Sequence, residues 1–133
     1  MALTAGRNTP EVAEGRTLVL PVKGATIIFD GSLVALNANG FAVPGDNVAG
    51  LTAAGRAEEY VDNSAGADGA VKVRVRRGVF KWSNDSVAPV TAQHVMKNCY
   101  ILDDETVTST AADASVAGKV IGLEDNEVLV ETI

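Results

Sequence analysis

The sequence predicts an all-β protein, a small barrel or sandwich with an extended N-terminal arm and at most one short helix. Valine occurs 19 times and leucine 9 times, and β-branched side chains suit the pleated surface of a sheet. Short apolar runs alternate with turn residues along the chain, as expected of many short strands. A length of 133 residues fits one domain, which we assign to residues 16–133.

Residues 1–15 form the predicted arm, because they are polar or small, contain a proline and show neither helical nor strand periodicity. A frayed terminus and an ordered strap over a neighbouring subunit both explain such a segment. For a strap, the expected contact residues are Ala2, Leu3, Thr4, Arg7, Asn8, Thr9 and Pro10.

The first half of the domain is predicted to hold five short strands. They lie at residues 16–22, 26–29, 33–36, 41–43 and 59–62. Pro21 has no N–H to donate, so it indicates a sheet edge or a strand end. Asn39-Gly40 predicts a tight hairpin turn, because this pair readily takes positive φ. The weakly patterned stretch 48–56 contains Gly50 and Gly55, which would permit a close backbone approach or a bulge.

The clearest strand follows a predicted loop at residues 63–69. The run Val71-Lys-Val-Arg-Val-Arg76 alternates apolar and basic residues, which is the period of a strand. After Gly78 the large apolar positions change phase to Phe80 and Trp82. A phase change at a glycine is typical of a β-bulge. We therefore predict one long strand kinked near Gly78, with both aromatic side chains in the core.

Residues 91–97 are the best helical candidate, with Thr91 as N-cap after Pro89. Such a helix would be only about two turns long. Residues 106–115 are small and polar. The remaining strands are predicted at residues 99–102, 116–123 and 128–133, the last two as a hairpin. No repeat of the solenoid or propeller kind is visible.

Composition excludes several classes of function. A formal net charge of −6 argues against a simple nucleic-acid binder, which needs clustered positive charge. One cysteine allows no intrachain disulfide. No apolar run approaches the roughly 18 residues of a membrane span, and the first ten residues lack the features of a secretion signal. We therefore expect a protein made in the cytoplasm, without a membrane partner.

Chemistry-bearing side chains are sparse. His94, Cys99 and Asp103 are the only set that resembles a thiol-based active site. Cys99 stands in an apolar run, where a buried structural cysteine is the more common role. The acidic turns at residues 103–105 and 124–127 lack the EF-hand pattern, and one histidine with one cysteine does not make a zinc site. We expect no catalytic residue, no metal and no cofactor.

Five of the eleven basic residues lie within ten positions: Lys72, Arg74, Arg76, Arg77 and Lys81. On a strand the first three share one face. That face is either solvated, which keeps a sheet edge from aggregating, or a contact with an acidic surface on a partner. Nucleic-acid binding is a weaker alternative, because the nearby aromatic residues are assigned to the core. Arg74 and Arg76 are the candidates for partner contact.

Several segments resemble small head proteins of Mu-like tailed bacteriophages and prophages. They are Met1–Pro10, Leu33–Pro44, Gly55–Asn63, Val75–Phe80, Cys99–Asp104 and Val116–Gly122. The likeness runs over nearly the whole chain, although no single segment is a chemical signature.

The resemblance implies a decoration (cement) protein that binds the major capsid protein on the outer surface of the phage head. Such proteins are usually homotrimers whose N-terminal arm reaches a neighbour, and they have no catalytic residues. Another virion part, such as a head-completion or tail component, is the alternative.

Overall fold

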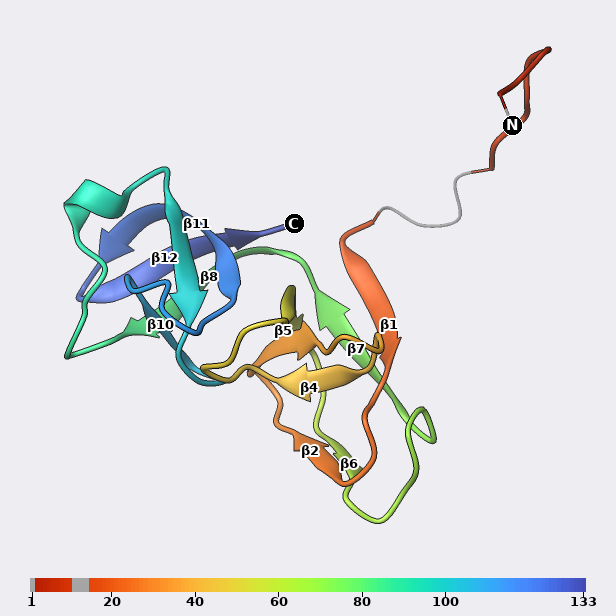
Figure 1. The fold of residues 1–133 in the computed structure, drawn as a ribbon, viewed down its shortest axis with the longest axis horizontal. Coiled ribbons are helices and arrows are strands. Elements are labelled where there is room, and N and C mark those ends of the chain that lie inside the picture. The colour runs from red at the N-terminus through yellow and green to blue at the C-terminus, as the bar shows by residue number, and fades with distance from the viewer. Residues whose placement is uncertain (1, 11–14) are drawn as a thin grey trace.

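A computed structural model describes residues 2–10 and 15–133 (Figure 1). The described residues of the first half form β1 (Thr17–Pro21), β2 (Thr26–Ile28), β3 (Leu33–Leu36), β4 (Ala42–Pro44), β5 (Thr52–Ala57), β6 (Val61–Asn63) and β7 (Lys72–Arg76). Those of the second half form β8 (Gly78–Asn84), β9 (Asn98–Ile101), β10 (Thr106–Thr108), β11 (Val116–Glu124) and β12 (Glu127–Thr132). Only the 3-10 turn Ala92–His94 is helical among them, so the predicted all-β class is confirmed.

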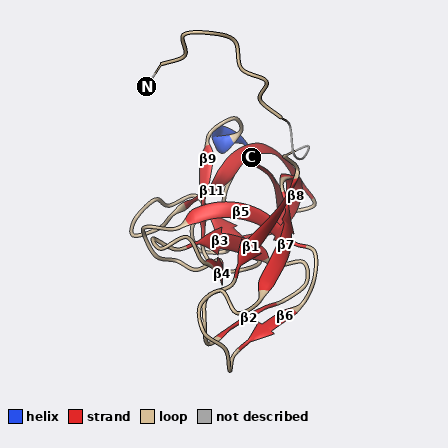
Figure 2. Ribbon diagram, turned by 90° about the vertical axis from the view of Figure 1, so that its right-hand side faces the viewer, coloured by secondary structure: helices blue, strands red, loops and turns tan. Residues whose placement is uncertain are grey.

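The strands form two main sheets and one small one. The first has five strands in the order β1-β7-β5-β3-β4, and the second is a closed barrel in the order β10-β8-β12-β11-β9. β2 and β6 pair separately. In Figure 2 the barrel strands β8, β9 and β11 surround one end of the molecule, and β2 and β6 form the opposite end. The first sheet is also nearly closed, because Val22 makes a parallel bridge with Ala42 of β4.

The two main sheets are two copies of one five-stranded unit. In chain order, β1, β3, β4, β5 and β7 correspond to β8, β9, β10, β11 and β12, and the spatial order is then the same in both. The parallel bridge of Val22 with Ala42 corresponds to the parallel pair Asn84 with Val107. The register also agrees, since a bulge places Gly55 opposite Val34 and Gly118 opposite Cys99.

Each unit has its own core, built from equivalent positions. The first contains Val22, Ile28, Val34, Ala42, Ala54, Ala57, Val61, Val73 and Val75. The second contains Leu33, Ala35, Trp82, Val90, Cys99, Ile101, Val107, Ala117, Val120, Val128 and Val130. Val73 and Val75 of β7 correspond to Val128 and Val130 of β12, and all four are fully buried. The period-two patterns in the sequence therefore indicate the inner faces correctly.

The units are joined through the outer face of β3. Leu33 and Ala35 of this strand belong to the core of the barrel. The backbone N–H of Leu33 donates to the carbonyl of Asp104 at 2.8 Å. Ser115 Oγ donates to the carbonyl of Val48 at 2.7 Å and accepts from the N–H of Leu51 at 2.9 Å. β5 also contacts the barrel, since Ala53 packs against the barrel core and Arg56 lies over the Phe80 ring.

The long strand predicted to kink near Gly78 is instead two strands in different sheets. β7 ends at Arg76 and pairs in the first sheet, whereas β8 begins at Gly78 and pairs in the barrel. Trp82 is buried and Phe80 packs against the barrel core, as predicted. The phase change in the sequence thus marks the crossing from one unit to the next.

The two-turn helix predicted over residues 91–97 is wrong in extent, since only Ala92–His94 form a 3-10 turn. The N–H of Met96 donates to the carbonyl of Val120 at 2.7 Å, and the N–H of Val120 donates to the carbonyl of Lys97 at 2.8 Å. These bonds to β11 use backbone groups that a longer helix would have paired internally.

Candidate functional site

Arginine side chains gather on the outer face of the first sheet. Arg56 of β5 lies directly opposite Arg76 of β7, and Arg74 and Arg76 lie opposite Val19 and Thr17 of β1. Arg56, Arg74 and Arg76 line a shallow hollow of about 390 Å³ together with Thr17 and Glu58. We call these five residues the arginine face.

The arginine face follows from the alternation in β7. Val73 and Val75 point into the core and are fully buried, so Arg74 and Arg76 project outward. The sequence predicted that these two arginines share a face, and the register confirms it. It did not predict Arg56, because no periodic pattern marks β5.

The charges on this face are only partly balanced. Arg56 pairs with Glu58 at 3.0 Å and its guanidinium lies 4.6 Å from the centre of the Phe80 ring. The Arg74 Nε lies 3.5 Å from Glu59. No carboxylate of the described residues pairs with Arg76. Because like charges directly across two strands destabilise a sheet, this face favours an anionic partner.

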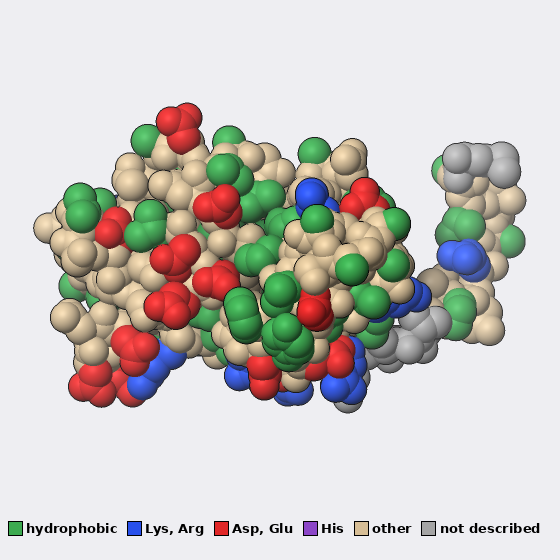
Figure 3. Space-filling view, turned by 90° about the horizontal axis from the view of Figure 1, so that it is seen from below, with side chains coloured by type: hydrophobic (Ala, Val, Ile, Leu, Met, Phe, Trp, Pro, Cys, Tyr) green, Lys and Arg blue, Asp and Glu red, His purple; other side chains and the backbone are tan. Residues whose placement is uncertain are grey.

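A second surface lies at the end of the molecule where β2 and β6 pair. Phe29 and Tyr60 follow β2 and precede β6, their ring centres are 5.8 Å apart, and they are 58% and 54% exposed. The adjoining hollow, of about 290 Å³, is lined by Phe29, Asp30, Gly31, Ser32, Asp104 and Glu105. We call these six residues and Tyr60 the acidic corner. Figure 3 views the molecule from this end and shows acidic and hydrophobic side chains side by side.

The acidic corner is also electrostatically unbalanced. Asp30, Asp104 and Glu105 make no ion pair with any other described residue. Ser32 is 6% exposed, and its Oγ has no hydrogen-bond partner within the described ranges. The sequence pattern gave the acidic turn at residues 103–105 no metal-binding role and gave Phe29 and Tyr60 no functional role. The contact of these two aromatic rings, which are tilted by 51°, joins distant segments through the β2–β6 pairing.

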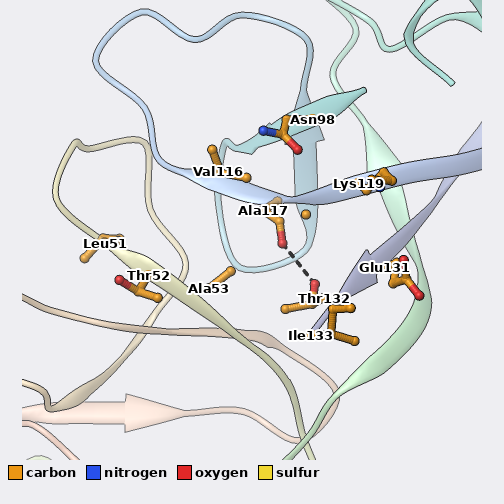
Figure 4. Close-up of a pocket in the computed structure, with 11 residues that line it drawn as sticks. Leu51, Thr52, Ala53, Asn98, Val116, Ala117, Lys119, Glu131, Thr132 and Ile133 are labelled. Carbon is orange, nitrogen blue, oxygen red and sulfur yellow. Dashed lines mark hydrogen bonds between the residues drawn. The ribbon is translucent and has the colours of Figure 1, made fainter. Parts of the chain in front are cut away.

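A groove of about 470 Å³ lies between β5 and the barrel strands β11 and β12. In Figure 4 its lining is mostly small or aliphatic, with Thr132 Oγ1 donating to the carbonyl of Ala117 at 2.9 Å. Lys119 and Glu131 are cross-strand neighbours at its rim. This lining contains no nucleophile with an adjacent base.

The three residues that resembled a thiol-based active site are held by other contacts. Cys99 is fully buried in the barrel core. His94 Nδ1 accepts from the N–H of Thr91 at 2.9 Å, and Asp103 Oδ1 accepts from the N–H of Glu105 at 2.9 Å. Burial raises the pKa of the Cys99 thiol to about 12, which suppresses the nucleophilic thiolate.

Cys99 is therefore expected to resist alkylation in the folded protein. With a pKa of about 12, the thiolate is a negligible fraction at pH 8. Reaction with iodoacetamide, followed by mass spectrometry, should be about a hundredfold slower or more than in urea-unfolded protein. Labelling of the folded chain at the unfolded rate would contradict this assignment and return Cys99 to the candidate nucleophiles.

The predicted arm is described only in part, since Met1 and residues 11–14 lie outside the described residues. Residues 2–10 form neither helix nor strand and are exposed. In Figure 1 they lie away from both sheets. One side-chain hydrogen bond occurs within them, from Arg7 to Thr9 at 3.4 Å. Contact of the arm with a partner remains a prediction.

Comparisons of the chain with protein-family models, curated proteins and solved structures found no match. In the described part of the chain, no helix has the length and apolar character needed to cross a membrane. Within the same residues, no group of three His, Cys, Asp or Glu side chains is placed to hold a metal ion. What the described surface offers is two charged faces of opposite sign, which suit binding to another protein.

Proposed function

We propose that this protein is a capsid decoration protein of a Mu-like tailed bacteriophage. It binds the outer surface of the head as a homotrimer and stabilises the lattice of the major capsid protein. The resemblance noted in the sequence motivates the proposal. The observation that carries it is the arginine face, a concentration of positive charge on one side of a chain whose net charge is −6.

The physical role requires no reacting group. A module that binds only the assembled lattice adds its binding free energy to the assembled state by mass action. Contacts made by several subunits of one oligomer reinforce each other through high effective concentration. A nearly closed sheet and a closed barrel, joined through the outer face of β3, make a compact module of this kind, whose outer charged faces remain available.

The exposed segment 2–10 supplies the second type of contact in this proposal. Its residues have no partner strand in the described structure, so an extended conformation can be completed by a neighbouring subunit or capsomer. Leu3 is exposed and apolar, and Arg7 carries the positive charge of the segment. Both are available to a partner surface without any change in the two sheets.

Deleting residues 2–10 should weaken attachment to phage heads about tenfold or more, while the thermal unfolding midpoint stays the same. The test is co-sedimentation of purified protein with undecorated heads. The control is the double variant Lys23→Glu and Lys97→Glu, which changes two exposed charges away from the arm and the arginine face. Equal occupancy by the deletion variant would contradict the role of the arm.

Electron microscopy of intact particles tests the function itself. The proposal expects the chain at many equivalent positions over the outer shell. A single ring of copies at one vertex would instead identify a head-completion or tail component. Absence of the chain from the particle exterior would overturn the proposed function altogether.

A further inference from the structure

We infer that the arginine face of one copy binds the acidic corner of a second copy. The inference rests on the proposed function, because it identifies the contact that holds the oligomer together. Both surfaces are built by the first sheet and its β2–β6 extension, with Asp104 and Glu105 contributed by the turn between β9 and β10. The occupant of each surface is therefore another molecule of the same chain.

Charge complementarity is the first argument. The arginine face carries Arg76, which no described carboxylate neutralises, beside Arg56 and Arg74. The acidic corner carries Asp30, Asp104 and Glu105, which no described cation neutralises. Elsewhere the chain is acidic overall, so random encounters between copies are repulsive. Opposed charged patches overcome that repulsion and fix the orientation of the contact.

Apolar groups accompany the charges on both surfaces. The chain has three phenylalanines, two tyrosines and one tryptophan, and Phe29 and Tyr60 are exposed as a pair in tilted ring contact. Exposed aromatic side chains at the centre of a contact are typical anchors of protein interfaces. Val19, which is opposite Arg74 in the sheet, is also exposed. Contact between these groups would remove apolar area from water on both copies.

The corner also offers the chemistry that an arginine needs. Guanidinium groups bind carboxylates through paired hydrogen bonds and stack on aromatic faces. Arg56 makes both kinds of contact within the chain, since it pairs with Glu58 and lies over the Phe80 ring. Ser32 is one of the lining residues, although its hydroxyl is buried. An entering guanidinium would meet three carboxylates and two aromatic rings.

Within one copy, the arginine face and the acidic corner do not neutralise each other. The two are connected through the segment from Glu58 to Tyr60, in which Glu59 pairs with Arg74. Within the described residues, neither Arg74 nor Arg76 makes an ion pair with Asp30, Asp104 or Glu105. The strands that carry them are fixed by backbone pairing, so the complement comes from a second copy. Repeated between copies, a contact between two different patches closes into a ring when the rotation between neighbouring copies divides a full turn.

Reciprocal charge reversal tests this contact. One variant combines Arg74→Glu with Arg76→Glu, and the other combines Asp30→Arg with Glu105→Arg. Sedimentation equilibrium should show self-association weakened about tenfold or more in each variant. An equimolar mixture should recover association between unlike copies, because the reversed face of one variant then meets the reversed corner of the other. A ring of three would keep one mismatched contact, so recovery is measured as the formation of pairs of unlike copies. Circular dichroism and thermal melts establish that each variant is folded, and Lys23→Glu with Lys97→Glu is the matched control.

Three outcomes would overturn the inference. They are a wild-type chain that stays monomeric at high concentration, reversed variants that associate normally, and a mixture that fails to recover association. In the second case, variants that still decorate heads would leave the proposed function intact. Conversely, recovery in the mixture together with no binding to heads would support the contact and reject the function.

Discussion

Replacing Gly118 by alanine is expected to destabilise the protein by about 3 kcal/mol or more. Gly118 occupies the bulge of β11 with φ of 157°, a conformation that other residues rarely adopt. An added Cβ would collide with the carbonyl oxygen of Glu131 and would lie 2.8 Å from Val130 Cγ1. Because both belong to the paired strand β12 of a closed barrel, neither can move without breaking the pairing.

Urea denaturation measures this effect, and the chain provides its own controls. Gly55 stands at the equivalent bulge of the first unit, with φ of 140°, and an added Cβ there would collide with the carbonyl oxygen of Arg76, so Gly55→Ala should cost about as much. Gly122 lies in the same strand as Gly118, and a Cβ there would meet Leu129 Cδ1 at an ordinary 3.7 Å. Gly122→Ala should change stability by less than about 1 kcal/mol. Equal effects of Gly118→Ala and Gly122→Ala would contradict the steric argument.

Gly55 and Gly118 are identical residues at equivalent bulges, but few other equivalent positions match. The duplication is therefore visible in the fold and not in the sequence. Equivalent inner positions keep only apolar character and burial, as in Val34 and Cys99 or Ala57 and Val120. Equivalent outer positions are unconstrained by packing and have diverged in charge, as in Arg76 and Glu131. Val73 and Val75 match Val128 and Val130, but short valine patterns occur in any β protein.

Strands with a local pattern could be predicted from the sequence, whereas strands made by distant contacts could not. The alternation in β7 and the turn at Asn39-Gly40 are local signals, and both were confirmed. β10 was not predicted, because Thr106–Thr108 has no apolar alternation. Thr108 is nevertheless fully buried, since its hydroxyl donates to Asp85 at 2.9 Å. A buried polar pair formed across the barrel leaves no signature in either segment alone.

The same distinction applies to the two charged surfaces. Arg74 and Arg76 were placed on one face by the period of two, and their register with β1 confirms this. The acidic corner brings together the segment after β2, the residue before β6 and the turn after β9, which no sequence window contains. Exposure of Phe29 and Tyr60 depends on where β2 and β6 end, and element ends are the least predictable feature of a sequence.

Asn63→Asp is the second substitution with a large expected effect, a loss of about 3–5 kcal/mol at pH 7. Asn63 is 3% exposed. Its Nδ2 donates to the carbonyls of Val22, Lys23 and Ala67 at 3.1, 3.1 and 2.9 Å. This amide ties the end of β6 to the end of β1 and to the following loop. A carboxylate in its place would direct negative charge at three carbonyl oxygens in a buried site.

The loss of stability caused by Asn63→Asp should increase as the pH rises. Burial and the three carbonyls disfavour the charged form, so the folded-state pKa of the introduced carboxyl rises above its unfolded value of about 3.9. The folded state then binds the proton more tightly, and the variant loses stability as pH rises from the unfolded pKa to the folded pKa. Urea denaturation at pH 4 and pH 7 should therefore show a smaller deficit, relative to wild type, at pH 4. Asn47→Asp makes the same chemical change at an exposed position and is expected to show neither the loss nor the pH dependence, so matching behaviour of the two variants would refute the role assigned to the Asn63 amide.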